Sequence, residues 1–171
     1  MRKLNQILVS LIFLILISLK CSSFAKAKEL VSNNVSVIDG DTILINNYKI
    51  RFSGIDAPES YFRGKKQVCF QNTKKILCGE EAKKKLVEKI GKSLVKCVPE
   101  KERDIYNRIL AECFVNNESL SVFMVKNGYA FDYPKYSKKK YSDFQNFAKK
   151  NKLGLWNMTF EYPWIWRKKN K

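Results

Sequence analysis

The stretch VSVIDGDTILINNYKIRFSGIDAPE, residues 35–59, decides the fold. Two short β-rich runs lie within it, residues 42–45 and 48–52, and Asn46 and Asn47 join them. Asparagine tolerates the left-handed backbone that a tight turn requires, so the pattern predicts a β-hairpin. The two ends of a hairpin lie side by side, so residues from both ends can form one site.

Both ends of this hairpin are acidic. Asp39 and Asp41 stand before the first strand, and Asp56 and Glu59 follow the second strand, which itself carries Arg51. Close carboxylates repel each other unless they share a proton or a cation. Either cluster alone is typical of an ordinary polar turn. Together with the arginine, the two clusters predict a site for a hard cation.

The composition narrows the class of protein. The chain has 171 residues, which is enough for one domain, and its formal net charge is +17. Such a charge favours a polyanionic partner, first nucleic acid and second an anionic membrane surface, although a merely lysine-rich soluble protein would show it too. Histidine is absent, which excludes histidine-based acid–base chemistry, Ser-His-Asp triads and His-ligated zinc.

The N-terminus has the pattern of an export signal. Two basic residues precede an apolar run at residues 7–19, and small-x-Ala cleavage sites end at Ala25 and Ala27. The run is shorter than the roughly 20 residues that span a bilayer, so a cleaved signal is favoured over a membrane anchor. We therefore expect residues 1–27 to be a signal peptide and residues 28–171 to be one secreted or periplasmic domain.

Four cysteines remain after the signal, an even number that suggests two disulfides in an exported chain. Cys97 and Cys113 fall on successive strand-like runs, and Cys69 and Cys78 bracket a loop. We expect the pairs Cys69–Cys78 and Cys97–Cys113. A zinc site made of all four is the competing interpretation, but the closely spaced C-x-x-C pair of such sites is missing.

Periodicity gives the remaining elements. Ala82, Leu86 and Ile90 form one apolar stripe, which predicts a helix over residues 79–90. The other expected elements are a polar leader at residues 28–33, a loop at 60–77, and strands at 93–98 and 108–115. We also expect a helix that ends at Gly128 and a helix at 138–150 with Phe144 and Phe147 inward. The aromatic tail at 160–166 should pack on the domain, and residues 168–171 should be frayed. Strands followed by helices, with no βαβ rhythm, predict an α+β (mainly β) fold, a five-stranded OB-fold barrel with three helices.

Aromatic and basic residues alternate over residues 129–141. Interleaved aromatic rings and cations can stack bases and hold phosphates, and they can equally anchor a loop to the core.

Three ordered motifs resemble the thermonuclease (staphylococcal-nuclease-like) family. They are V-I-D-G-D-T, then R-F-S-G-I-D-A-P-E, then R-D-I-Y-N-R at residues 103–108, and a late G-L-W follows at residues 154–156. Asn107 stands where the family usually has glycine, and asparagine is the next-best residue for a positive φ.

The resemblance implies a nuclease that uses Ca²⁺ rather than Mg²⁺, with DNA or RNA as its substrate. The metal ligands that it implies are Asp41, Asp56 and the backbone carbonyl of Ala57, with Asp39 acting through water. It assigns phosphate binding to Arg51 and Arg108, the general base to Glu59, and a nucleotide contact to Tyr133 or Tyr136. We therefore expect a monomeric, calcium-dependent endonuclease. The alternative is a basic OB-type module that binds nucleic acid without cutting it.

Overall fold

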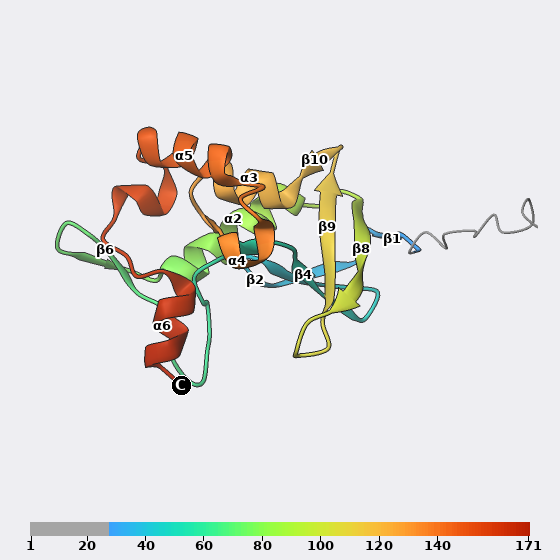
Figure 1. The fold of residues 1–171 in the computed structure, drawn as a ribbon, viewed down its shortest axis with the longest axis horizontal. Helices are drawn as coiled ribbons and strands as arrows, with labels where there is room; N and C mark the ends of the chain where they lie inside the picture. Colours follow the sequence, from blue (N-terminus) through green and yellow to red (C-terminus); the bar gives the residue numbers. More distant parts are fainter. Residues whose placement is uncertain (1–27) are drawn as a thin grey trace, which may run out of the picture.

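The computed structural model describes residues 28–171, which form a mixed α+β fold dominated by a sheet (Figure 1). The expected signal peptide, residues 1–27, lies outside the described residues. Within the described part, no helix is both long enough and apolar enough to cross a membrane.

The expected hairpin is confirmed. Strand β3 (Thr42–Ile45) pairs with β4 (Tyr48–Phe52), so that Thr42 lies opposite Arg51. Asn46 and Asn47 both have a positive φ, 49° and 66°, which is the conformation of the tight turn that matches the twist of two paired strands.

The main sheet extends this hairpin on both sides. Its strand order is β1-β8-β9-β4-β3-β2, with β10 paired to β9, and only the β4–β9 pairing is parallel among those described. The added strands are β1 (Leu30–Ser32), β2 (Val35–Asp39), β8 (Val95–Arg103), β9 (Ile109–Val115) and β10 (Glu118–Ser119). The two ends of this order, β1 and β2, are consecutive in the chain and lie two residues apart. The expected polar leader is therefore wrong, because β1 pairs with β8 and Leu30 packs against the core.

The three helices expected from the sequence are present, two of them against the sheet and the third against a helix (Figure 1). They are α2 (Cys78–Ile90), α3 (Leu120–Lys126) and α5 (Ser142–Lys150). The stripe of Ala82, Leu86 and Ile90 is buried, which confirms the first helix. Ser119 caps the N-terminus of helix α3, because its hydroxyl accepts a hydrogen bond from the Val122 N–H.

The helical part differs from the prediction in several places. The described chain also has α4 (Pro134–Ser137), a short 3₁₀ helix η1 (Gly154–Asn157) and α6 (Pro163–Lys169). Helix α5 begins later than expected, because Lys138 and Lys139 adopt a positive φ that no α-helix accommodates. Phe147 is 47% exposed rather than inward. Residues 168–169 are helical rather than frayed, because α6 continues through them.

The expected loop at residues 60–77 contains a second hairpin, which projects from the body (Figure 1). Its strands are β6 (Cys69–Gln71) and β7 (Lys74–Ile76). The backbone of Phe70 also bridges to Thr159 in the tail. Three-residue strands carry too little alternation to be recognised from sequence, which explains the miss.

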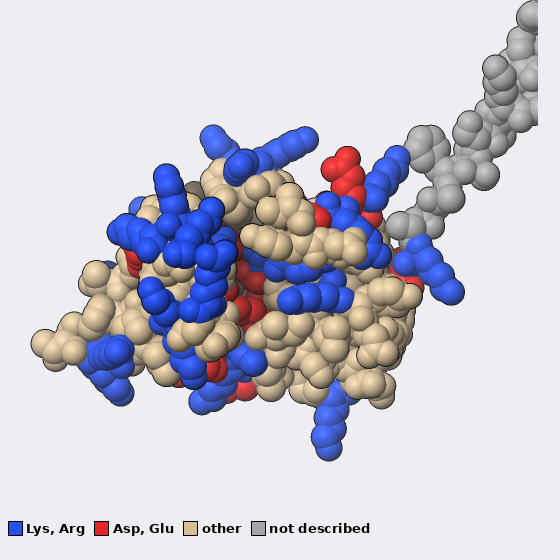
Figure 2. Space-filling model, turned by 90° about the horizontal axis from the view of Figure 1, so that it is seen from below, with Lys and Arg blue, Asp and Glu red and all other residues tan. Residues whose placement is uncertain are grey.

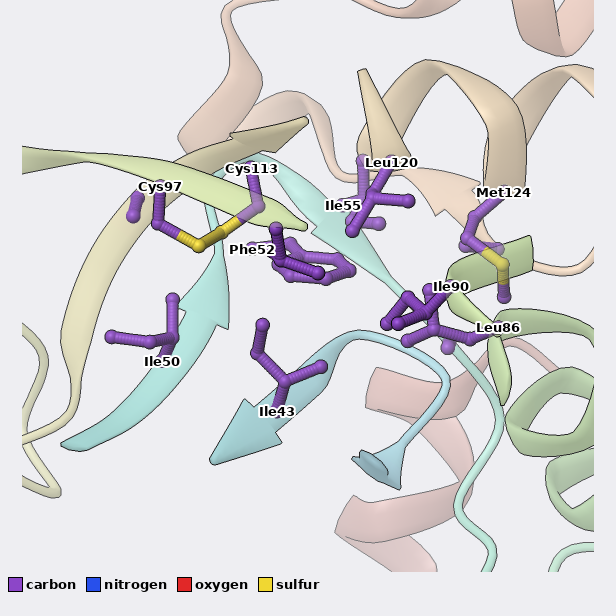
Figure 3. Close-up of a cluster of buried hydrophobic side chains, with 14 of the residues drawn as sticks. Ile43, Ile50, Phe52, Ile55, Leu86, Ile90, Cys97, Cys113, Leu120 and Met124 are labelled. Atoms are coloured by element: carbon purple, nitrogen blue, oxygen red, sulfur yellow. A yellow bond between two sulfur atoms is a disulfide. The ribbon is translucent and has the colours of Figure 1, made fainter. Parts of the chain in front are cut away.

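The core has two parts. The larger part lies between the sheet and helices α2 and α3, and it holds the Cys97–Cys113 disulfide beside Ile50 and Phe52 (Figure 3). The smaller part centres on buried Phe131 and includes the Cys69–Cys78 disulfide and the aromatic tail. Both disulfides have the pairing that the sequence analysis expects.

Candidate active site

Acidic side chains gather in a hollow of the face seen in Figure 2, with basic side chains on both sides of it. Arg51 is the residue that joins the two acidic clusters. Its Nη1 pairs with Asp41 Oδ2, and its Nη2 donates to Asp56 Oδ1 at 2.6 Å. A further bond from Nη2 to the Ile55 carbonyl, at 2.9 Å, fixes the guanidinium. The two carboxylates therefore flank one cation, as the hairpin prediction requires.

Asp41 is held in place from several sides and is only 5% exposed. Its Oδ2 accepts a hydrogen bond of 2.7 Å from the Ala57 N–H, and its Oδ1 accepts one of 2.9 Å from the Thr42 hydroxyl. Gly40 allows this close approach, because a Cβ there would lie 2.8 Å from the Ala57 Cβ. The backbone at Ala57 thus lies beside the Asp41 carboxylate.

Asp56 is fully buried and comes from the short strand β5 (Ile55–Asp56). This strand pairs with β11 (Phe131–Asp132), with Phe131 opposite Asp56. A charged carboxylate without partners is costly to bury. The contacts of Asp56 with arginine are therefore needed for stability as well as for any function.

Glu59 is positioned through Gln67, which is itself fully buried. The Gln67 side-chain oxygen accepts a bond from the Glu59 N–H at 3.1 Å, and the Gln67 N–H donates to the Glu59 carbonyl at 3.0 Å. The Gln67 amide nitrogen also donates to the Glu161 carbonyl at 2.7 Å. One buried amide therefore ties the Glu59 backbone to the C-terminal tail.

Asp39 contacts the backbone next to Glu59. Its Oδ1 accepts bonds from the N–H groups of Gly40, at 3.1 Å, and Ser60, at 3.0 Å. Burial first, and then the charge of Glu59, raise the pKa of Asp39 to about 7. No hydrogen bond or ion pair joins Asp39 to Arg51 among the described residues.

Among the described residues, Arg108 forms no ion pair with the carboxylates of the two acidic clusters. It pairs with Asp104, Nε to Oδ2 at 2.6 Å, and it follows Asn107, which adopts the expected positive φ of 61°. Its side chain is 22% exposed and can be reached by a phosphate. Burial lowers the pKa of Arg51, and the positive charge of Arg108 lowers it further. The structure thus places Arg108 near the site without a carboxylate of the site as its partner.

The two candidate tyrosines differ in exposure. Tyr133 stacks on Trp164 with ring centres 4.8 Å apart, whereas Tyr136 is 62% exposed and meets Tyr133 edge-on. Burial first, and then the charge of Asp56, raise the pKa of Tyr133. Tyr133 therefore packs against helix α6, and Tyr136 lies on the exposed side of it.

Sequence reasoning missed Arg167 entirely. This residue of helix α6 donates from Nη2 to Asp56 Oδ2 at 2.8 Å and from Nη1 to Glu59 Oε1 at 2.5 Å. The tail was expected only to pack. The sequence shows only that Arg167 lies three positions after Trp164, so that both lie on one face of a helix, and it does not show where that face docks.

The donor set suits a hard cation. Among residues 28–171, no group of three or more His, Cys, Asp or Glu side chains is arranged to hold a metal ion. Asp41 and Asp56 nevertheless meet at one guanidinium, so their oxygens converge, and Ca²⁺ accepts carbonyl and water oxygens for the rest of its shell. The residues thus fit a cation held by two carboxylates and completed by backbone and solvent.

Comparisons with known proteins find sequences that are similar to this chain. Residues 49–158 match the family model described as staphylococcal nuclease homologue. The chain is 31% identical over 134 residues to "Staphylococcal-like nuclease CAN1" of Arabidopsis thaliana, which covers 77% of this chain and 36% of that protein. It is 30% identical over 145 residues to an "Uncharacterized endonuclease" of Haemophilus influenzae, which covers 80% of this chain and 72% of that protein.

A third relative is "Endonuclease YhcR" of Bacillus subtilis, 33% identical over 135 residues. The match covers 71% of this chain but 11% of that protein. The chain also spans 40% or less of the plant relatives that it matches. The chain therefore matches only a part of each of these relatives.

Proposed function

Because the chain belongs to the staphylococcal nuclease homologue family, we propose that it is an exported, calcium-dependent endonuclease that hydrolyses phosphodiester bonds in DNA or RNA. The observation that carries the proposal is Arg51 held between buried Asp41 and Asp56. A fold gains nothing in stability from placing two carboxylates around one buried arginine that apolar side chains could not supply. The same arrangement is what a phosphate and a cation require.

Each residue then has a defined role. Asp41, Asp56 and the carbonyl of Ala57 would hold Ca²⁺, with Asp39 acting through water; the bound ion would offset the negative charge that develops on the phosphate. Glu59 takes a proton from the water that attacks phosphorus. Arg51 and Arg108 hold non-bridging phosphate oxygens, because a guanidinium offers paired donors and stays charged.

The substrate would lie across the hollow of Figure 2, where basic side chains border the acidic ones. The formal charge of +17 supports a polyanionic substrate. Tyr133 lies beside Asp56 and supports a nucleotide contact there, with Tyr136 as its exposed neighbour. We propose that the chain acts as a monomer, since one chain supplies every residue named.

We propose that residues 28–171 form one domain, in which the sheet closes into a five-stranded OB barrel. The support is topological: β1 and β2 are the outermost strands of the sheet order, yet only two residues connect them. A connection this short brings both edges of the sheet together, and closure would remove both exposed edges.

The competing function is a nucleic-acid-binding module that does not cut. One observation favours it: the oxygens of Asp56 already accept bonds from Arg51 and Arg167, and within residues 28–171 no three acidic side chains are arranged to hold a metal ion. The experiment below separates the two functions.

Cleavage of single- and double-stranded DNA and of RNA by the oxidised mature chain tests the proposal, in Ca²⁺, in Mg²⁺ and in EGTA. We expect cutting in Ca²⁺ that EGTA abolishes. Asp41→Asn should lower the rate by about 10²-fold or more, because it removes a ligand charge, while Asp143→Asn, the same change at an exposed position of α5, should leave it unchanged. Binding without cutting under every condition would establish the competing function instead.

A further inference from the structure

Arg167 joins the two acids to which the proposed function gives different roles. Its Nη1 lies 2.5 Å from Glu59 Oε1 and 3.1 Å from Asp56 Oδ1, and its Nη2 lies 2.8 Å from Asp56 Oδ2. One guanidinium therefore spans the proposed metal ligand and the proposed base. The bonds connect residues 111 and 108 positions apart in the chain.

Helix α6 holds this arginine firmly. Trp164 is stacked between Tyr133 and Tyr162, with ring centres 4.8 and 4.6 Å apart, and Trp166 packs edge-on against Phe62. Stacked and edge-on aromatic pairs add stability beyond the area that they bury. The side chain of Lys65 also donates to Asn170 at 3.0 Å, just past the helix. The arginine is thus delivered to the site by a docked helix rather than by a loose tail.

The position of Arg167 conflicts with cation binding. Asp56 is fully buried, its Oδ1 accepts bonds from both Arg51 and Arg167, and its Oδ2 accepts one from Arg167. A divalent cation needs at least one of these oxygens. A guanidinium at hydrogen-bond distance from the same oxygens would repel that cation, because like charges oppose each other strongly where water is largely excluded.

We propose that Arg167 and the divalent cation compete for Asp56 and Glu59, so that the C-terminal helix restrains its own active site. Cation binding then requires the guanidinium to leave these two carboxylates. The inference rests on the proposed function, since it needs Asp56 to be a cation ligand. It adds that residues far outside the hairpin set the affinity for the cation.

Two other roles for Arg167 make the opposite prediction. If Arg167 orders Asp56 and Glu59 for the cation, its loss should weaken cation binding. If Arg167 acts only on the phosphate of a bound substrate, its loss should leave cation binding unchanged when no nucleic acid is present. The direction of the change in affinity therefore decides among the three roles.

The test is calorimetric titration of the mature chain with Ca²⁺ in the absence of nucleic acid. Arg167→Gln keeps part of the stem and its hydrogen-bonding ability but removes the charge, and we expect it to bind Ca²⁺ about tenfold tighter or more. Lys168→Gln removes one charge from the same helix at an exposed position, so its affinity should match that of the wild type. Matching far-ultraviolet circular dichroism spectra of the three proteins would show that the fold is unchanged, even where the lost bonds to buried Asp56 lower the unfolding temperature of Arg167→Gln.

Equal or weaker Ca²⁺ binding by Arg167→Gln would overturn the competition. If such a variant still cleaves DNA only with Ca²⁺, this inference fails while the proposed function stands. If neither the wild type nor Arg167→Gln binds Ca²⁺ and neither cleaves DNA, the proposed function fails as well.

A second measurement on the wild-type chain covers the case in which Arg167→Gln does not fold. Saturating Ca²⁺ should speed hydrogen exchange of the α6 amides, because the helix loses its bonds to Asp56 and Glu59. Exchange in α6 that slows or stays the same would contradict the inference.

Discussion

Asp56 and Glu112 are both carboxylates with several donors around them, but their surroundings differ. Asp56 accepts bonds from Arg51 and Arg167. Glu112, on strand β9, accepts bonds from the Ser119 hydroxyl, from Lys140 Nζ at 2.6 Å and from the Tyr141 hydroxyl at 2.5 Å. Arg51 and Arg167 each bond a second acid besides Asp56. Within residues 28–171, the donors at Glu112 bond no other acid.

This difference distinguishes a functional site at Asp56 from a structural contact at Glu112. At Glu112 a single charge joins the sheet to the N-cap of α3 and to the residue before α5, and its donors balance it. At Asp56 the acids outnumber the arginines that bond them, and carboxylates crowd together at a cost in repulsion. Such crowding is a feature of functional sites, where stability is given up for chemistry.

A substitution at Arg51 tests the comparison between Asp56 and Glu112 most strongly. Arg51→Lys keeps the charge but cannot bond Asp41, Asp56 and a phosphate together, so we expect the rate of cleavage to fall by about 10²–10³-fold. Arg103→Lys makes the same change at an exposed arginine outside the site and should cleave normally. Equal rates for both variants in a saturating-substrate assay would remove Arg51 from the reaction.

The smaller effect concerns the Glu112 cluster. Tyr141→Phe removes the hydroxyl that Glu112 accepts, and we expect a loss of about 1–2 kcal/mol in the free energy of unfolding with normal cleavage. Urea unfolding at neutral pH measures the loss. A variant as stable as the wild type would show that this tie contributes nothing.

The same variant has a defined pH dependence. Burial first, and then Glu112, raise the pKa of Tyr141 to about 12, above the value of about 10 in an unfolded chain. The unfolded state therefore releases this proton first, and the tyrosine contributes stability that is lost as the pH rises from about 10 toward 12. The difference in stability between the wild type and Tyr141→Phe should accordingly shrink above a pH of about 10. A difference that stays constant would contradict the assignment.

The sequence predicted the parts of the site that depend on local geometry. Asn46 and Asn47 set the turn, the turn sets the register, and the register brings Asp41 to Asp56 through Arg51. Helix α2 was equally clear, because its apolar stripe has helical spacing.

The parts that were missed depend on contacts between distant segments. Arg167 reaches Asp56 only because the aromatic tail docks on Phe131 and Tyr133, and no local pattern states where a tail will dock. The hairpin β6–β7 was missed because its strands are short, and the late start of α5 because lysine rarely adopts the positive φ of Lys138. Gln67 was overlooked for the same reason as Arg167: its importance comes from being buried between the Glu59 loop and the tail.

The most direct test compares two equivalent substitutions, Glu59→Gln and Glu112→Gln, for both cleavage in Ca²⁺ and free energy of unfolding. We predict that Glu59→Gln lowers the cleavage rate by about 10²–10⁴-fold with little change in stability, because it removes the proposed base. Glu112→Gln should instead lose about 1–3 kcal/mol of stability and, while folded, cleave at the wild-type rate. Normal cleavage by Glu59→Gln, or an equal loss of cleavage by folded Glu112→Gln, would contradict the account.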